Sequence, residues 1–204
     1  ANFIDDFLGG LILIAYALVV GTLFWRAWVL RKVEGQPHGG VGAHRAALHV
    51  LRFGGKSLAI MQGTKLVMKG LVLWGVLGDL PLTDYLATVQ FQAGLARLVL
   101  AVLILWQTQT LLQNPESPKA WRNIYFLAIP LVAAGAWLVH AVGRFEHREP
   151  LMLLTLTHQM AAAIWFGGIA QLLALWRLGS RDEEARKLWP LAIVRFGMLG
   201  VAAV

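Results

Sequence analysis

The stretch LMLLTLTHQMAAAIWFGGIAQLLALW, residues 151–176, decides the class of fold because it contains no Asp, Glu, Lys or Arg. A helix needs roughly 20 predominantly apolar residues to cross a bilayer, so this stretch is long enough to span one. It nevertheless contains His158, and an ionisable side chain inside a membrane span is costly enough to count as a functional hypothesis by default. The pair Gly167-Gly168 removes side-chain bulk and would let another helix or a cofactor approach closely.

The composition of the whole chain agrees with a membrane protein. Of the 204 residues, 58% are hydrophobic and 14% are charged, and no separate soluble domain fits. We expect an all-α, polytopic bundle of about six spans that forms a single transmembrane domain over residues 1–204. The expected spans are residues 7–30, 57–78, 85–112, 121–143, 151–176 and 189–204. Because the last of them stops inside an apolar run, we expect the chain to be part of a longer protein.

The basic residues lie mostly in alternate connections, which predicts an orientation. The formal net charge is +7, without a basic patch with interleaved aromatics of the nucleic-acid-binding type. One set of connections carries only Arg144 and Arg148. The other set carries Arg31, Lys32, Arg45, Arg52, Lys56, Lys119, Arg122, Arg177, Arg181, Arg186 and Lys187. The positive-inside rule then places the second set in the cytoplasm and the N-terminus outside.

Residue types limit the available chemistry. The chain has no cysteine, which excludes disulfides, thiolate metal sites and covalent c-type haem attachment. A bound metal must therefore use His, Met or oxygen ligands. No nucleophile motif, phosphate-binding glycine loop or carboxylate pair lies within a span, so an enzyme is the less favoured interpretation.

Two histidines in neighbouring spans form the candidate metal site. His140 is about one helical turn from the outer end of its span, and His158 is about two turns inside the next, which must run antiparallel. They could share a ligand, or each could hydrogen-bond a carbonyl across a helix interface. Met160 follows His158 by two positions, about 200° around a helix, so it fits a packing role better than direct ligation beside His158.

A second polar feature is cationic. Gln62, Lys65 and Lys69 share one face of the second expected span, and Arg97 lies in the third. No Asp or Glu is expected at the same depth, so these cations would attract an anion such as a haem propionate, a lipid phosphate or an anionic substrate. The alternative is snorkelling of the lysines toward cytoplasmic headgroups.

The long basic connection after the first span has its own pattern. Residues 43–53 are amphipathic and predict a separate interfacial helix. His38, His44 and His49 do not share a helix face well, and we expect all three to be solvated. The acidic run at residues 182–184 is likewise expected in a solvated loop.

A resemblance to a known family favours the metal-site interpretation of the two histidines. The pattern His-x-x-Ala-Ala-x-x-Trp-x-Gly-Gly is present, and Arg195-Phe196-Gly197 follows it. With Arg97 and His140 in the preceding spans, it resembles the bacterial CopD copper-resistance family of inner-membrane proteins over about residues 94–204. The residues of the pattern are His158, Ala161, Ala162, Trp165, Gly167 and Gly168.

The resemblance implies a function, and the residues leave alternatives open. It implies an all-helical protein that moves copper from periplasm to cytoplasm, beside a periplasmic copper-binding partner of the CopC type, with membrane lipid around it. His158 and His140 would bind copper, with Met160 assisting. The first alternative is a b-type haem electron-transfer protein with both histidines as axial ligands and Lys65, Lys69 or Arg97 near the propionates. The second is a non-catalytic subunit that docks a partner on the face of Gly167-Gly168.

Overall fold

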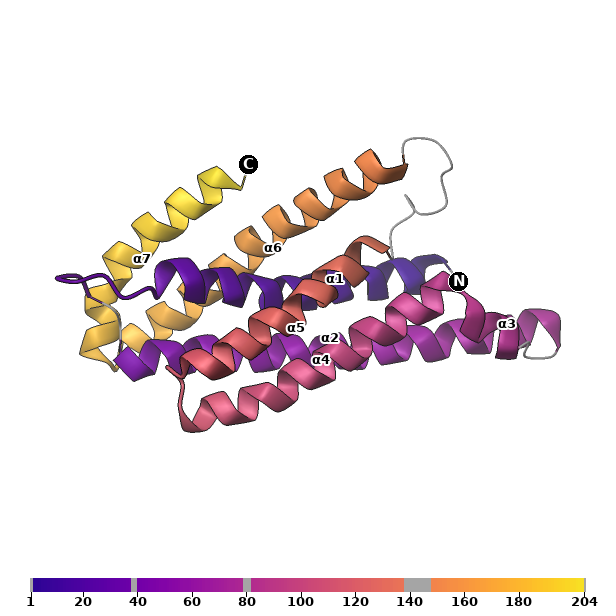
Figure 1. The fold of residues 1–204 in the computed structure, drawn as a ribbon, viewed down its shortest axis with the longest axis horizontal. Coiled ribbons are helices and arrows are strands. Elements are labelled where there is room, and N and C mark those ends of the chain that lie inside the picture. The colour runs from indigo at the N-terminus through magenta and orange to yellow at the C-terminus, as the bar shows by residue number, and fades with distance from the viewer. Residues whose placement is uncertain (1, 38–39, 79–81, 138–147, 204) are drawn as a thin grey trace.

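The computed structural model describes residues 2–37, 40–78, 82–137 and 148–203, and the regular structure in them is entirely helical. The expectation of an all-α fold is therefore confirmed for the described residues. Figure 1 shows the helices running back and forth along one long axis (Figure 1). They are α1 Asn2–Phe24, the π-helical turn η1 Trp25–Val29, α2 Gly40–Leu77, α3 Leu82–Ala87, α4 Val89–Gln113, α5 Pro118–Trp137, α6 Arg148–Gly179 and α7 Glu183–Ala202.

Four segments are long and apolar enough to cross a membrane, judged by length and composition. They are Phe3–Val29, Gly40–Leu77, Val89–Gln113 and Glu149–Gly179. They contain most of the expected first, second, third and fifth spans. The expected fourth span is described only as far as Trp137, and α7 begins with Glu183, Glu184, Arg186 and Lys187. A total of six spans stays a prediction.

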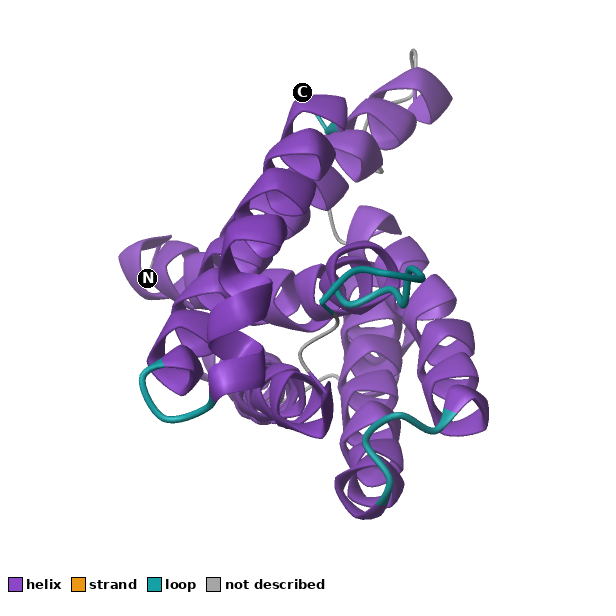
Figure 2. Cartoon of the chain, turned by 90° about the vertical axis from the view of Figure 1, so that its left-hand side faces the viewer, coloured by secondary structure: helices purple, strands orange, loops and turns teal. Residues whose placement is uncertain are grey.

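The core is organised around α1, which packs against α2 on one side and α6 on the other. Further pairs are formed by α2 with α4, α4 with α5, and α6 with α7. Figure 2 views the bundle from the left-hand side of Figure 1 and shows helices joined by loops, without strands among the described residues (Figure 2). One apolar cluster joins α1, α2, α4 and α5, and a second joins η1 to the start of α2, the end of α6 and α7. The chain therefore packs as one bundle.

The helix α2 corrects the expectation of a separate interfacial helix at residues 43–53. It is one continuous helix of 38 residues that also contains the second expected span. Its buried residues recur three or four apart from Ala43 through Leu58 to Gln62, so a single stripe faces the bundle. Gly54 and Gly55 do not break the helix because they are contact points: a Cβ on Gly54 would lie 2.7 Å from the Leu18 Cβ.

The glycine pair of α6 also lies inside the bundle. A Cβ on Gly167 would lie 2.7 Å from the Cα of Gly21 in α1, so the two backbones touch. Gly168 faces the ring of Phe196 in α7, 2.7 Å from its Cδ2 by the same measure. Both glycines are thus covered by helices of this chain, which removes the surface on which a docking subunit was expected to bind its partner.

Arg195 closes the far end of the first helix. Its Nη1 donates hydrogen bonds to the carbonyls of Val29, at 2.5 Å, and Arg31, at 3.0 Å, while Nη2 donates to Gln36 Oε1 at 2.7 Å. The last carbonyls of a helix lack partners within it, and a cation there also suits the helix dipole. Trp28 Nε1 returns a hydrogen bond to the Arg195 carbonyl at 3.1 Å. Arg195 therefore ties α7 to η1.

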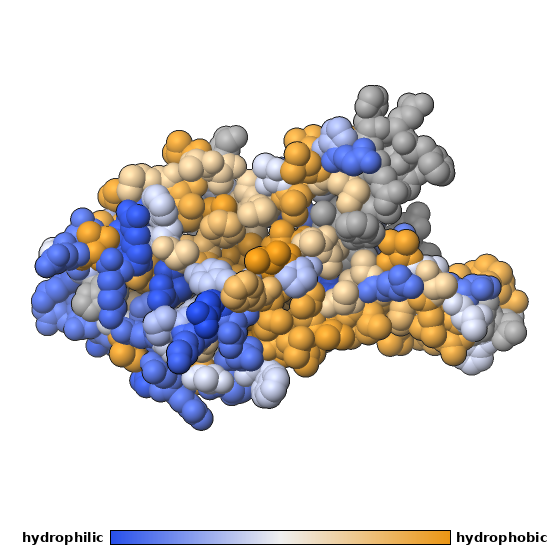
Figure 3. Space-filling view, viewed as in Figure 1, coloured by the Kyte–Doolittle hydropathy of each residue, from blue (hydrophilic) through white to orange (hydrophobic). Residues whose placement is uncertain are grey.

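The bundle has one strongly hydrophilic end. The connections from η1 to α2, from α4 to α5 and from α6 to α7 all lie on the left in Figure 1, and the same end is the bluest in Figure 3 (Figure 3). We call it the basic end because these connections carry Arg31, Lys32 and Arg181, and Lys119 lies in the first turn of α5 beside them. Between it and the opposite end lies a largely apolar surface, as a membrane protein requires.

Candidate functional site

Polar side chains meet at the centre of the bundle around Arg97 of α4. Only 4% of Arg97 and 1% of Tyr16 is exposed. The guanidinium carbon of Arg97 lies 5.5 Å from the centre of the Tyr16 ring, within the range of a cation–π interaction. Gln62 of α2 is also buried, with 3% exposed. With Gln159 of α6, these side chains form what we call the Arg97 cluster.

Two glycines make room for the cluster. A Cβ on Gly135 of α5 would lie 2.9 Å from Arg97 Nη2 and 3.1 Å from Gln159 Oε1. A Cβ on Gly94, one turn before Arg97, would lie 2.8 Å from Gln62 Nε2. Any larger residue would therefore push a polar group of the cluster aside. Gly135 brings α4, α5 and α6 together at one level of the bundle.

Several polar atoms of the cluster lack hydrogen-bond partners among the described residues. They are Tyr16 Oη, Gln62 Oε1, Arg97 Nε and Gln159 Oε1. Arg97 also takes part in none of the ion pairs of the described residues, which involve Lys32, Lys65 and Lys187. Unpaired polar atoms are costly when buried, and in a bundle of apolar helices they mark a functional site. The described surroundings of Arg97 would attract an anion and repel a cation.

The expectation that the lysines of α2 lack a carboxylate partner is wrong for Lys65, whereas the partner of Lys69 is an amide. Lys65 Nζ lies 3.1 Å from Asp5 Oδ1, because the start of α1 lies beside this part of α2. Lys69 Nζ donates to Gln90 Oε1 at 3.0 Å. The lysines extend toward the end of the bundle opposite to the basic end, and not toward the lipid headgroups expected at the basic end. Their separation from the buried Gln62 divides the predicted polar stripe into two environments.

His158 lies on α6 with its side chain exposed, whereas the following Gln159 is half-buried and reaches the Arg97 cluster. Successive residues of a helix are about 100° apart, so the two side chains face different surroundings. Met160 is half-buried. His140 lies outside the described residues, as does His147. The predicted pairing of His158 with His140 thus stays a prediction.

The described residues offer few ligands for a metal ion. No group of three or more His, Asp or Glu side chains there is close enough to hold one ion. A metal at His158 would therefore need His140 or a methionine as a further ligand. For haem, both lysines already have partners at Asp5 and Gln90, which leaves Arg97 for a propionate. Arg97 is buried against Tyr16 and Gly135, a poor position for so large a group.

The histidines of the basic connection separate in the structure. His49 is exposed, as expected, but His44 is buried with 1% exposed, so its expected solvation is wrong. The reason is the continuity of α2, which places His44 in the same buried stripe as Ala43 and Ala47. His38 lies outside the described residues. In the acidic run, Asp182 caps α7 by accepting a hydrogen bond from the Ala185 N–H at 3.1 Å.

Sequence reasoning missed Tyr16 and Gln159 as members of the site. Gln159 was visible as a polar residue inside residues 151–176, and Tyr16 as the hydroxyl-bearing side chain of the first apolar run. Nothing in the periodicity tells which helices they face. Comparison of the chain with known protein families, with curated proteins and with solved structures gives no match.

Proposed function

We propose that the chain handles copper in a bacterial inner membrane, moving it from the periplasm toward the cytoplasm. His158 is the principal ligand, His140 the partner ligand and Met160 an auxiliary one. The observation that carries the proposal is the position of His158, an imidazole within a helix long and apolar enough to span a membrane. Imidazole and thioether are ligands that copper accepts.

The packing of α5 on α6 supports the choice of His140 as the partner. Gly135 of α5 lies against Gln159 of α6, so the two helices meet next to His158. His140 follows Gly135 by five residues in the sequence.

The charge of Arg97 supports a path for the metal outside the bundle centre. The guanidinium of Arg97, which has no ion-pair partner among the described residues, repels a cation strongly where the dielectric constant is low. His158 faces away from it, on the exposed side of α6. Copper would therefore pass along that side, while Arg97 keeps cations out of the centre.

The orientation belongs to the same proposal. With the basic end in the cytoplasm, the N-terminus and the start of α6 face the periplasm. His158 then lies in the outer half, within reach of a periplasmic copper-binding protein of the CopC type.

The test is a copper titration of the purified protein. We expect Cu(I), measured by competition with a chromophoric chelator, to bind to the wild type and to lose at least about tenfold in affinity in His158→Ala, since a metal ligand is removed. Thr157→Ala and His49→Ala are matched controls, because both positions are exposed and neither belongs to the site. Unchanged affinity in His158→Ala would refute the site.

A visible spectrum of the same sample separates copper from haem. We expect no Soret band. A Soret band with reducible α and β bands, lost in His158→Ala, would replace the copper proposal by a b-type haem protein.

A further inference from the structure

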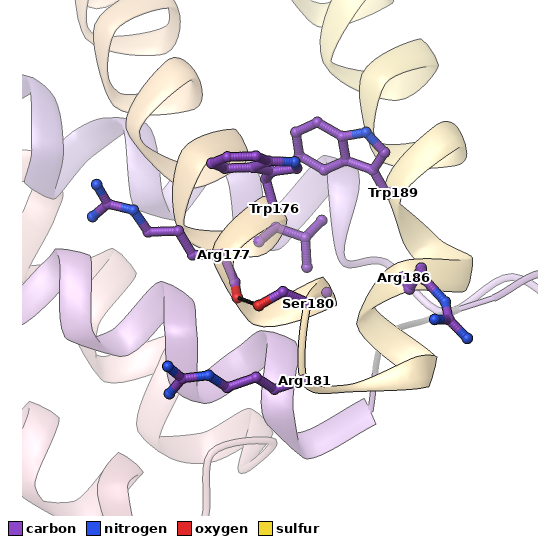
Figure 4. Close-up of a pocket in the computed structure, with 8 residues that line it drawn as sticks. Trp176, Arg177, Ser180, Arg181, Arg186 and Trp189 are labelled. Carbon is purple, nitrogen blue, oxygen red and sulfur yellow. Dashed lines mark hydrogen bonds between the residues drawn. The ribbon is translucent and has the colours of Figure 1, made fainter.

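A cavity of about 710 Å³ opens where α6 turns into α7, at the basic end of the bundle. Its polar lining consists of Arg177, Ser180, Arg181 and Arg186, and its flat apolar lining of Trp176 and Trp189. Figure 4 shows Arg177 and Arg181 extending on one side of the turn and Arg186 on the other, with both indoles on the side toward the helix bodies (Figure 4). We call this cavity the turn pocket.

None of the three arginines of the turn pocket forms a direct ion pair in the part of the chain that the structure describes. Each is exposed, and none takes part in an ion pair or donates a side-chain hydrogen bond there. The hydroxyl of Ser180 already donates to the Arg177 carbonyl at 2.8 Å. The guanidinium groups are therefore the free donors of the pocket.

The neighbouring acidic residues make their direct contacts elsewhere, although the pKa of Glu183, lowered mainly by Lys187, is also lowered by the nearby Arg186 guanidinium. Glu183 Oε1 pairs with Lys187 Nζ at 2.8 Å. Asp182 caps α7, and its Oδ2 would lie 2.5 Å from a Cβ on Gly42 of α2. Glu184 faces Gly40, at the very start of α2. The acidic residues 182–184 thus contact α2 or Lys187, and the three arginines leave the pocket with a net positive charge.

The surroundings of the turn pocket are apolar on the membrane side. Trp176 is 60% exposed, and tryptophan is enriched where a protein passes from lipid to headgroups. Above it, the exposed face of α6 continues with Phe166, Ile169 and Leu173. A ligand that combines an anionic head with apolar chains would match both parts. Inorganic phosphate would match only the first.

We propose that the turn pocket binds an anionic phospholipid, with its phosphate held by Arg177 and Arg181 on one side of the turn, Arg186 adding positive charge from the other side, and one acyl chain lying along the exposed face of α6. Guanidinium groups bind phosphate through paired, charge-assisted hydrogen bonds. Basic pockets between helices at the cytoplasmic side of a membrane recognise anionic headgroups, and the indoles hold the site at the interface. The site does not depend on copper binding, but its place on the cytoplasmic side rests on the orientation proposed above.

The test uses the full chain in a neutral detergent, titrated with phosphatidylglycerol and followed by native mass spectrometry and thermal unfolding. We expect saturable binding that raises the melting temperature, no such effect of phosphatidylcholine, and none of inorganic phosphate. In the triple variant Arg177→Gln/Arg181→Gln/Arg186→Gln, we expect binding to weaken at least about tenfold, because each basic group near an anionic lipid contributes separately.

A control variant with the same loss of charge isolates the pocket from the general charge of the basic end. Arg45→Gln/Lys119→Gln/Arg122→Gln changes three exposed positions outside the pocket. It should bind phosphatidylglycerol like the wild type. Equal weakening in both triple variants would show a diffuse electrostatic effect and overturn the proposal, as would equal binding in all three proteins. An equal response to inorganic phosphate would overturn the lipid assignment.

Single variants protect the test from a folding failure. If the triple variant does not fold, Arg177→Gln, Arg181→Gln and Arg186→Gln are titrated separately, and each should bind phosphatidylglycerol at least about twofold more weakly. Trp176→Leu, which keeps the charge of the pocket, should weaken the binding of phosphatidylglycerol less than any of the three arginine variants does. Three single variants with wild-type affinity would overturn the proposal.

Discussion

At the scale of single residues, the centre of the molecule depends on one position without a side chain. Gly135 lets Arg97 and Gln159 approach the backbone of α5. Arg97 has Tyr16 as its aromatic neighbour but no carboxylate among the described residues. A buried cation in this situation costs stability, so its presence is explained better by a function than by folding.

The coupling between Gly135 and Arg97 can be measured with a double-mutant cycle. We expect Gly135→Ala to lower the free energy of unfolding by about 1–3 kcal/mol, because its Cβ would meet Arg97 Nη2 at 2.9 Å. Arg97→Met should unfold at or above the wild-type temperature, since it removes an unpaired charge. The double variant should recover part of the loss, and strict additivity would contradict the close packing.

At the scale of helices, the contact between α1 and α6 is a backbone contact. Gly21 and Gly167 face each other, and neither backbone can yield as a flexible side chain could. Interfaces of this kind depend on small residues at the crossing point. This contact holds α6 against α1 at Gly167, which lies a little past the middle of α6.

A substitution at this crossing has a matched control in α7. We expect Gly167→Ala to destabilise the protein by about 1–3 kcal/mol, because the added Cβ would lie 2.7 Å from the Gly21 Cα. Gly197→Ala, with nothing within 4 Å, should instead stabilise the helix by up to about 1 kcal/mol. Thermal unfolding in detergent compares them. Equal effects of the two substitutions would refute the crossing.

The elements also show what the sequence could and could not predict. Runs of apolar residues located the long helices, because spanning a bilayer fixes the length of a segment. The expected boundary between an interfacial helix at residues 43–53 and the span at 57–78 was wrong, because Gly54 and Gly55 lie within α2 as contacts with Leu18 and Leu105. The Arg97 cluster could not be predicted, since it depends on which helices are neighbours and on a rotation of about 100° that separates Gln159 from His158.

At the scale of the whole molecule, the helices divide the surface into a basic end, an apolar middle and an opposite end that contains the start of α1 and α3 (Figures 1 and 3). Lys65 and Asp5 pair toward the opposite end. The distribution of charge between the two ends is what the positive-inside rule uses to orient a membrane protein.

The proposed orientation can be tested with single cysteines, because the chain has none. Thr83→Cys in α3 and Asn114→Cys in the turn between α4 and α5 are exposed positions at opposite ends. In intact bacteria, a maleimide that does not cross the inner membrane should label Thr83→Cys and not Asn114→Cys. The reverse pattern would place the basic end outside, and labelling of both would contradict a membrane-spanning arrangement.

The length of α2 has a mechanical consequence. At about 1.5 Å per residue, its 38 residues extend for about 57 Å, whereas a bilayer with its headgroups is about 40–45 Å thick. Unless it tilts strongly, α2 projects beyond the lipid as a stiff rod. Its buried stripe holds Gln62, next to Gly94 of α4. A soluble protein that bound the projecting end of α2 would therefore be connected to the polar centre of the bundle by one continuous helix.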